Sequence, residues 1–387
     1  GEQNLAVGFE SMKAQTTGGN NIAIGYKSQL ALYAATADEN VSLGNFTLDG
    51  VGNVALHSCT AIGHSALSGV LTDTASGSVA VGRDALLALT SGAGNTAVGY
   101  QSLDAQVTGD NNTAIGYSAL GANAVADGAG NNTAVGFEAA KLLVTGVDNV
   151  VIGSAALDAA DGGETSNIAI GGNAMGAVDE GANDHADANI AIGQNALTGG
   201  TLTDGAGNLS HNIAIGYDAL ADTGVNDHLG TIAIGYAALG ALTSGSGNVA
   251  VGYSALTTNE DGGYNTAVGY ESLNVFEADA SNHGQNTAVG YRSGKFVSTG
   301  TYNTFLGSGS GQGITGTRLT GDSNTAVGQD SGILLQGAAH ENTFLGQGSG
   351  DVVTTGSDNT CIGFGADTDD ATAVSYTHLT LPTNREV

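Results

Sequence analysis

Hydrophobic and polar positions along the chain follow one short pattern that recurs from end to end. The pattern is a pentapeptide of Asn, a β-branched or aliphatic residue, a small residue, an aliphatic residue and Gly, as in Asn-Thr-Ala-Val-Gly at 95–99. Successive copies start 17 to 23 residues apart, and in every copy the fourth residue is aliphatic, the fifth is Gly and the eighth is Ala, Ser or Thr. The unit is therefore 17 residues long, with insertions of up to six. Its twenty copies begin at Asn4, Asn21, Asn40, Cys59, Ser78, Asn95, Asn112, Asn132, Asn149, Asn167, Asn189, Asn212, Thr231, Asn248, Asn265, Asn286, Asn303, Asn324, Asn342 and Asn359.

The second to fourth residues of each copy are expected to form a short β-strand. A period of 17 residues is too short for a repeat built from two helices, and β-branched residues favour strands. Side chains alternate across a strand, so Thr96 and Val98 share one face. Asn95 and Ala97 share the other. Because the residue at the position of Val98 is always aliphatic, we expect Val98 and its equivalents to face the core.

Each unit is expected to form one coil with two short strands and two turns. The second strand is predicted near 101–103, and the turn at 108–111 is rich in Thr, Gly, Asp and Asn. The predicted fold class is all-β, a parallel β-solenoid or β-roll of about twenty 17–23-residue coils, each pairing its backbone with the coils above and below. The Gly at the end of each strand suits a corner that needs a positive φ or a close approach of the next coil. Corner glycines of this kind are Gly99, Gly116, Gly136, Gly153, Gly252 and Gly269.

Three stretches of the chain differ in their version of the pattern. Residues 1–285 carry repeats of the form Asn-x-Ala-Val/Ile-Gly-x-x-Ala/Ser-Leu, and 286–370 carry the variant Asn-Thr-x-Val/Leu-Gly-x-x-Ser-Gly, which we interpret as the same solenoid. Residues 375–387 lack the repeat and hold the single proline, Pro382. That last stretch resembles a peptide translated from a sequencing adaptor ligated to environmental DNA; a genuine disordered tail is the alternative. The chain starts at Gly1 without a leader, which indicates a removed signal or a fragment.

The predicted core is thin, because one Val or Ile and one Leu-like residue per coil bury little apolar surface. We therefore expect chains to pack against one another, with a homotrimer as the most natural assembly. Small residues at the third and eighth positions, such as Ala97 and Ser102, would allow close approach of a second sheet or subunit. The alternative is a monomeric solenoid with an Ala-lined interior.

Composition and charge exclude several classes of protein. With 64 Gly and one Pro in 387 residues, neither collagen nor a Pro-rich linker fits. The net charge of −29, from 8 Lys and Arg against 37 Asp and Glu, argues against binding to nucleic acid or to anionic membranes. No stretch approaches about 18 uninterrupted apolar residues, so no membrane span is predicted in this segment.

The tandem Asn-x-Ala-Val/Ile-Gly-x-x-Ala/Ser pattern resembles the head repeats of trimeric autotransporter adhesins of the YadA-like type. The longer form at 95–103, with its Thr-Gly-x-x-Asn turn at 108–112, also looks like repeats in bacteriophage tail fibres and large marine surface proteins. The resemblance covers residues 1 to about 370, although the unit is longer than the usual coil of the adhesin head. It implies a left-handed β-roll assembled as a trimer. It also implies an extracellular location, on a bacterial cell surface or in a virion tail fibre, and attachment to a host-surface glycan or protein receptor.

Aromatic residues concentrate at the sixth repeat position and are expected to form a ladder along one edge of the solenoid. Packing at the corner or contact between subunits is the first interpretation. The alternative is a glycan-binding stripe, because aromatic faces suit the apolar faces of sugar rings. The candidate ligand-stacking residues are Tyr100, Tyr117, Tyr217, Tyr236, Tyr253, Tyr270 and Tyr291, and Phe9, Tyr26, Phe137 and Phe364 occupy the same position.

Three long insertions gather carboxylate and imidazole groups. Either the carboxylates bind Ca²⁺ through their oxygen atoms, or the insertions are solvated loops without a metal ion. The calcium nonapeptide and the EF-hand spacing are both absent from the sequence. We expect no cofactor, with structural calcium as the less favoured alternative. The residues are Asp179, Glu180, Asp184, His185 and Asp187, then Asp222, Asp227 and His228, then Glu277, Asp279 and His283.

No enzymatic motif stands out, so we expect no catalytic residue and no enzyme activity. The Gly-x-Gly-x-x-Gly match at 311–316 lies in a chain rich in Gly with no helix predicted after it, and is interpreted as chance. Cleavage of a polysaccharide by paired carboxylates, as in tailspike-like β-helices, is a weaker alternative. Cys59 and Cys361 are interpreted as small-residue substitutions sixteen coils apart.

The function expected from the sequence is that of a non-enzymatic fibrous surface protein, the head or shaft of an adhesin or a phage tail-fibre segment. An ice-binding face is disfavoured at this point. Ten copies carry Thr at the second position, but alternation places these residues beside the expected core residue Val98 and its equivalents.

Overall fold

A computed structural model describes most of the chain as two compact units. Unit 1 comprises Gly1–Gln194 with Thr201–Gly205, and unit 2 comprises Asn195–Gly200 with Ala206–Val387. The described residues are 3–15, 17–31, 37–50, 54–121, 130–160, 162–178, 186–200, 208–224, 228–277, 284–368, 371–372 and 377–379.

In unit 1 every copy of the pentapeptide forms one three-residue strand from its second to fourth residues. The strands are β1 (Leu5–Val7), β2 (Ile22–Ile24), β3 (Val41–Leu43), β4 (Thr60–Ile62), β5 (Val79–Val81), β6 (Thr96–Val98), β7 (Thr113–Ile115), β8 (Thr133–Val135), β9 (Val150–Ile152), β10 (Ile168–Ile170) and β11 (Ile190–Ile192). One short 3₁₀ helix, η1 (Asp73–Ala75), lies between β4 and β5.

Unit 2 repeats the arrangement and adds two short strands. Its repeat strands are β13 (Ile213–Ile215), β15 (Ile232–Ile234), β16 (Val249–Val251), β17 (Thr266–Val268), β18 (Thr287–Val289), β19 (Thr304–Leu306), β20 (Thr325–Val327), β21 (Thr343–Leu345) and β22 (Thr360–Ile362). β12 (Leu209–Ser210) and β14 (His228–Leu229) pair with each other, and β23 (Thr377–Leu379) pairs in parallel with β22.

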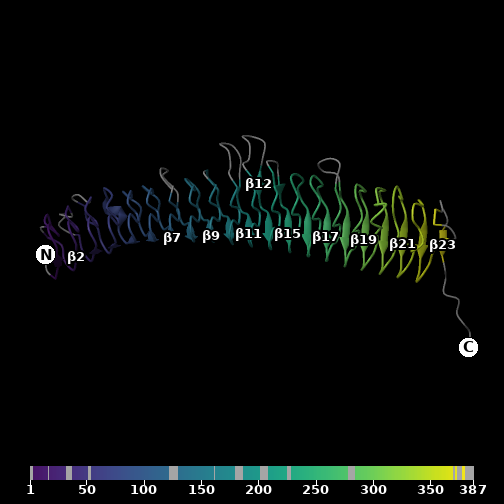
Figure 1. Ribbon diagram of the computed structural model, residues 1–387, viewed down its shortest axis with the longest axis horizontal. Coiled ribbons are helices and arrows are strands. Elements are labelled where there is room, and N and C mark those ends of the chain that lie inside the picture. Colours follow the sequence, from purple (N-terminus) through teal and green to yellow (C-terminus); the bar gives the residue numbers. More distant parts are fainter. Residues whose placement is uncertain are drawn as a thin grey trace, which may run out of the picture. The chain divides into compact units, whose positions relative to one another are not determined.

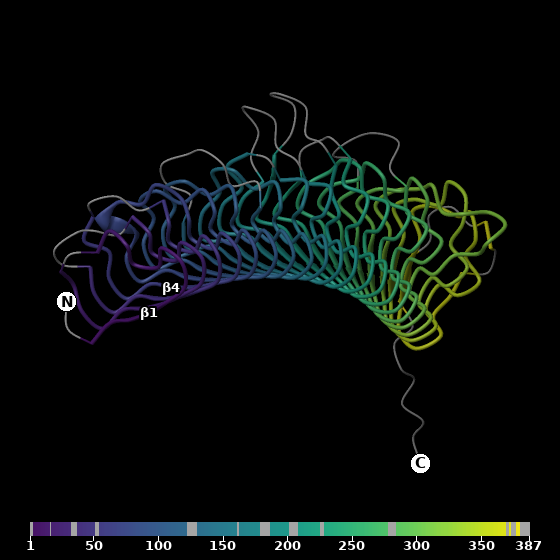
Figure 2. The ribbon, with the colours of Figure 1, turned by 60° about the vertical axis from the view of Figure 1, so that its left-hand side comes forward.

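Within each unit, consecutive repeat strands pair in parallel and in register. Thr96 lies opposite Thr113, for example, and Val249 lies opposite Thr266. Figures 1 and 2 show the coils of each unit stacked one upon the next. The predicted all-β, parallel β-solenoid fold is therefore confirmed.

The prediction of a second strand in each coil is wrong. In the segment 101–103, Gln101 and Leu103 both adopt φ 51°, in the left-handed region, so the backbone is not extended. Its N–H groups still bond to neighbouring coils: Gln101 N donates to Arg83 O and Leu103 N donates to Ala119 O, both at 3.0 Å. The segment thus acts as a tight turn that contributes to the stacking without forming a strand.

The predicted inner face of the strand is also wrong, because the alternation runs the other way. Asn95 and Ala97 are fully buried, whereas Thr96 and Val98 are half-buried on the outer face. The coil is narrow, and the side chain that points inward from the strand meets the Leu at the ninth position, such as Leu103, which is also fully buried. A small third residue, present in most copies, leaves room for that Leu, and the second and fourth residues point outward.

A ladder of buried Asn side chains runs along the interior of the solenoid. Asn112 N and Asn132 N each donate, at 2.9 Å, to Oδ1 of the Asn one coil earlier, Asn95 and Asn112. Asn95 Nδ2 donates at 2.8 Å to the carbonyl of Gly109, in the turn that leads to the next strand. Each amide thus satisfies backbone groups that the corner leaves without a sheet partner, because buried polar groups need a hydrogen bond.

The corner glycines lie where two coils approach most closely. Gly99 and Gly116 both have φ 143°, which L side chains rarely adopt. A Cβ added at Gly99 would overlap the carbonyl oxygen of Gly116 in the next coil. Both the conformation and the contact therefore require Gly at this corner.

Candidate binding surfaces

The outer residues of the strands form a surface that we call the strand face: the second and fourth residues of each copy. No copy places a charged residue at either position, although the net charge of the chain is −29. Ten of these aliphatic side chains are exposed: Leu5, Val7, Ile22, Leu43, Ile115, Ile152 and Ile192 in unit 1, and Val289, Leu306 and Leu345 in unit 2. Within each unit these exposed apolar side chains recur along the stacked strands, and clustered apolar surface of this kind is typical of an interaction site.

The same face carries the threonines, which corrects the expectation that they lie beside the core. In unit 2 six consecutive strands, β17 to β22, have a Thr at the second position, and these residues pair directly from strand to strand. The Thr side chains are half-buried or exposed rather than enclosed. They are Thr266, Thr287, Thr304, Thr325, Thr343 and Thr360.

The predicted aromatic residues form ring stacks within each unit. In unit 2 five tyrosines stack in sequence, with ring centroids 5.0–5.6 Å apart and interplanar angles of 7–17°. We call these five the Tyr ladder: Tyr217, Tyr236, Tyr253, Tyr270 and Tyr291. In unit 1 a shorter stack joins Tyr100, Tyr117 and Phe137. Phe9 also stacks on Tyr26, whose ring meets Phe46 edge to face at 79°.

Ring stacking limits what these aromatics offer to a ligand. Each inner ring of the Tyr ladder has a neighbouring ring against each face, so its edge and hydroxyl face the solvent instead of a flat surface. The guanidinium of Arg292 lies 4.9 Å from the Tyr291 ring centroid, and Arg292 Nε donates to Glu271 Oε2 at 2.8 Å. A sugar ring stacks on an open aromatic face, and few ring faces of the Tyr ladder are open.

One aromatic residue at the sixth position has an open ring. Phe364 is 84% exposed and lines a cavity of about 340 Å³ with Asp330, Gln347, Gly348, Asp351 and Gly365. Next to it, burial and a hydrogen bond that the protonated Asp367 donates to Asp351 raise the pKa of Asp367 to about 6. These two carboxyl groups are hydrogen-bonded to each other, whereas the paired carboxyl groups of a glycosidase lie about 5 Å or more apart.

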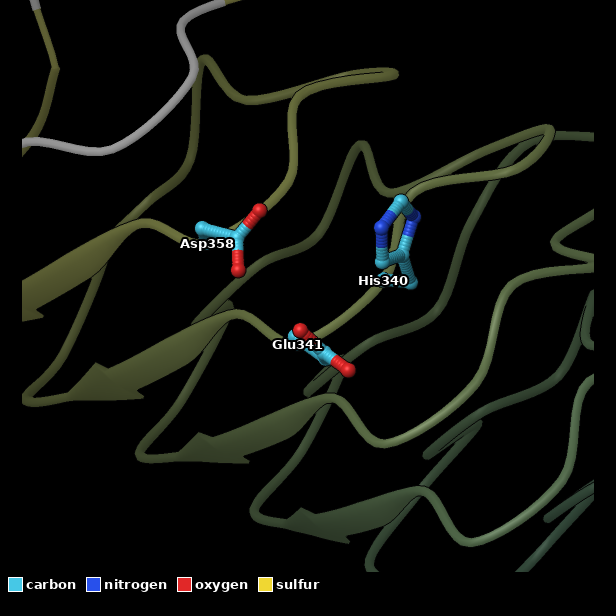
Figure 3. Close-up of side chains that lie close together, drawn as sticks. All are labelled: His340, Glu341 and Asp358. Atoms are coloured by element: carbon cyan, nitrogen blue, oxygen red, sulfur yellow. The ribbon is translucent and has the colours of Figure 1, made fainter.

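A second group of charged side chains lies on the turns before β21 and β22. His340, Glu341 and Asp358 are exposed, and their potential ligand atoms all lie within 4.8 Å of one another (Figure 3). His340 Nδ1 lies 2.8 Å from the carbonyl oxygen of Ala338, which leaves Nε2 as the ring atom available to a cation. Among the described residues, these three are the group that could hold a metal ion.

The acidic insertions, for which structural calcium was the less favoured alternative to solvated loops, are only partly described, and the described members do not come together. Asp187 Oδ1 accepts a hydrogen bond from Thr165 N at 2.8 Å. His228 is fully buried, with Nε2 2.5 Å from Thr223 O and 3.1 Å from Thr243 O, so it belongs to the core. Asp222 and Glu277 join no metal-ligating group within the described part of the chain. Asp179, Glu180, Asp184, His185, Asp227, Asp279 and His283 lie outside the described residues.

The two cysteines and the first glycine of the Gly-rich match occupy core positions. Cys59 and Cys361 are free and fully buried, and burial raises the pKa of Cys361 to about 11, so its thiol stays neutral. Gly311 packs directly against the ring of Phe305, inside the coil, whereas Gly316 is exposed.

Comparisons with protein-family models, with curated proteins and with solved structures return no match to this chain. In the residues that the structure describes, no helix is long and apolar enough to cross a membrane.

Proposed function

We propose that this chain is a non-enzymatic fibrous protein of a bacterial cell surface or virion tail fibre, which assembles with copies of itself, as a homotrimer, and mediates attachment to a glycan or protein receptor. The observation that supports the proposal is the strand face. It is built from aliphatic residues and Thr, carries no charge and is half-buried or exposed, on a chain whose net charge is −29.

A second copy of the chain is the partner that suits this face. Parallel strands repeat every 4.7–4.9 Å, so ridges of side chains on one copy match the grooves of another copy over many coils. Acidic groups lie on the turns and not on the strand face, so copies that pack through this face keep their like charges apart. Burial of this stripe also supplements a core built largely from Ala, Ser and Leu.

The test is the molar mass in solution of the full chain and of two matched variants. Ile115 and Ile152 lie on the strand face with 40% and 39% exposure, and Leu87 and Leu142 lie elsewhere with 39% and 41%. We expect Ile115→Asp with Ile152→Asp to dissociate the assembly, because burying two carboxylates is costly. Leu87→Asp with Leu142→Asp is the control and should leave the mass unchanged. If both double variants change the molar mass equally, with an unchanged circular dichroism spectrum, the proposed interface is contradicted.

A second candidate function for the strand face is binding to an ice surface. It is favoured by the six consecutive threonines of β17 to β22, which form a regular, uncharged array of hydroxyl and methyl groups. Thermal hysteresis of the full chain tests it, with Thr304→Lys and Thr325→Lys expected to abolish the effect. Thr315→Lys and Thr317→Lys, on exposed turn positions, are the control. If further copies of the chain cover the strand face instead, no thermal hysteresis is expected.

Glycan binding through the Tyr ladder remains the alternative mode of receptor attachment. A glycan array compared before and after Tyr253→Ala and Tyr270→Ala tests it. Because the inner ring faces are covered, we expect any bound glycan to be retained in these variants.

A further inference from the structure

We propose that the Tyr ladder is a site of oxidative cross-linking, at which neighbouring phenols couple to dityrosine and join consecutive coils of one chain. The inference rests on the ring geometry of unit 2 and is independent of the proposed self-assembly. It assigns a covalent modification to residues whose sugar-stacking role the geometry disfavours.

The rings are arranged so that neighbouring phenols are already paired. The centroids of Tyr236 and Tyr253 lie 5.0 Å apart with planes 9° from parallel, and those of Tyr253 and Tyr270 lie 5.1 Å apart at the same angle. Equivalent carbons of two such rings are separated by about one strand spacing, roughly 4.8 Å. Coupling requires two ortho carbons to close this distance, and the stacked arrangement already holds the two rings side by side.

The ladder is also accessible to an oxidant. Each of the five tyrosines is 42–48% exposed. Because the ring faces pack against one another, the exposed portion is the edge that carries the hydroxyl and its ortho carbons. The proton lost on oxidation therefore passes directly to solvent.

The chemistry requires a one-electron oxidant of the peroxidase class with hydrogen peroxide. Each of two phenols loses one electron and one proton to give a phenoxyl radical. The radicals couple to form one carbon–carbon bond between ortho positions, and both rings regain aromaticity when the two ortho hydrogens move to the oxygens. The two electrons and two protons reduce one hydrogen peroxide to two waters.

Two tyrosines outside the Tyr ladder are controls for the effect of solvent exposure alone on oxidation. Tyr264 and Tyr302 are 56% and 58% exposed, more than any residue of the Tyr ladder, and neither takes part in a ring stack within the described residues. If exposure alone governed oxidation, these two would react first. If stacking governs it, cross-links will join ladder neighbours.

The experiment oxidises the full-length chain at low concentration with a heme peroxidase and hydrogen peroxide, and in parallel with a small photo-excited ruthenium oxidant that reaches enclosed sites. Dityrosine fluorescence reports the yield. An acid-specific protease cuts between Tyr253 and Tyr270 at Glu260 and Asp261, so the expected product is a pair of joined peptides. Tyr264 lies in the same peptide as Tyr270, so fragmentation of the product must place the bond on Tyr270. Tyr236 and Tyr253 have no acidic residue between them, so their cross-link appears as one peptide lighter by two hydrogens.

Matched variants make the result specific. Tyr253→Phe keeps the ring in the stack but removes the phenol from two of the four neighbouring pairs of the ladder, so the yield from unit 2 is expected to fall by about half. Tyr302→Phe should leave it unchanged. The proposal is overturned if both oxidants give no dityrosine, if Tyr264 or Tyr302 supplies the main product, or if the cross-links join different chains and fade on dilution.

Discussion

Two stretches of unit 2 fill the same interior with different side chains. The coils that begin at Asn248 and Asn265 place Ala at the third position and Leu at the ninth, as in Ala250 and Leu256. The four coils that begin at Asn286, Asn303, Asn324 and Asn342 place Gly at the ninth position, and in two of them the third residue is Phe. We call them the Ala/Leu coils and the Phe/Gly coils.

The change from Ala and Leu to Phe and Gly keeps the total volume of the core side chains similar across neighbouring coils. Phe305 lies between Gly294 and Gly311, and a Cβ added at either glycine would crowd its ring. Phe344 has the same relation to Gly332 and Gly350. One aromatic ring thus fills the space that Leu side chains of two coils occupy elsewhere, as expected where interiors are close-packed.

The two types of coil share the backbone that surrounds this position. Leu256 has φ 51° in the Ala/Leu coils, and Gly311 has φ 54° in the Phe/Gly coils. The Gly at the ninth position is therefore required by the volume of Phe and not by the turn. The Tyr ladder also ends at Tyr291, in the first Phe/Gly coil.

The largest expected effect comes from emptying the Phe/Gly core. Phe305→Ala should lower the free energy of unfolding by about 3–5 kcal/mol, the usual cost of a Phe-sized cavity. Chemical denaturation measures it, with Phe364→Ala, at an exposed ring, as the control that changes little. Adding Gly311→Leu to Phe305→Ala converts the coil to the Ala/Leu type and should recover part of the loss. A double variant less stable than Phe305→Ala alone would contradict the volume exchange.

The next effect is common to both types of coil, because both rely on the Asn ladder. Asn265→Ala removes the acceptor for Asn286 N, at 3.1 Å, and leaves buried backbone groups without partners. We expect a loss of about 2–3 kcal/mol in unfolding free energy. Asn324→Ala, in the Phe/Gly coils, should cost a similar amount. A negligible change at either position in a denaturation series would show that the ladder does not stabilise the stack.

A smaller, stabilising effect is expected in unit 1, where one Ala/Leu coil has a polar residue in its core. Gln106 is buried at the position that Leu89 and Leu143 occupy in other coils, and both of its amide atoms lack a hydrogen-bond partner among the described residues. Gln106→Leu should raise the unfolding free energy by about 1–2 kcal/mol. Leu89→Gln is the reciprocal variant and should lower it. A Gln106→Leu protein that melts earlier than the wild type would refute this reading of the core.

The smallest effect is the pH dependence from Asp367, which follows the last Phe/Gly coil. Because burial and Asp351 raise the pKa of Asp367 to about 6, the folded state holds this proton more tightly than the unfolded state. Its contribution to stability is therefore greatest below the ordinary carboxyl pKa and is lost as the pH rises through about 6. Thermal melts across this range should show a decline that Asp367→Asn removes. An identical decline in Asp367→Asn would assign it to other groups.

The repeat was sufficient to predict the coil, the strand position and the parallel pairing, but not which way each side chain points. The position of Val98 is aliphatic in every copy, which suggested a core residue, whereas the small residue that most copies carry at the position of Ala97 was the better signal for the narrow interior. Asn95 was expected outside because it shares a face with Ala97, opposite the expected core residue Val98. Its burial depends on carbonyls such as Gly109 O, which only the folded coil brings near. The pairing of Phe305 with Gly311 was visible as two neighbouring substitutions in one copy, but its meaning required the inward direction of the third residue. The ring stacking of the Tyr ladder follows from the register, whereas the covered ring faces follow from the measured geometry.

The most direct test of the central claim, that the strand face packs against further copies of the chain, is the molar mass of the full chain by light scattering after size-exclusion chromatography. The account predicts about three times the mass of one 37.9 kDa chain, and the mass of one chain for Ile115→Asp with Ile152→Asp. A wild-type chain that elutes as a folded monomer at all concentrations would contradict it.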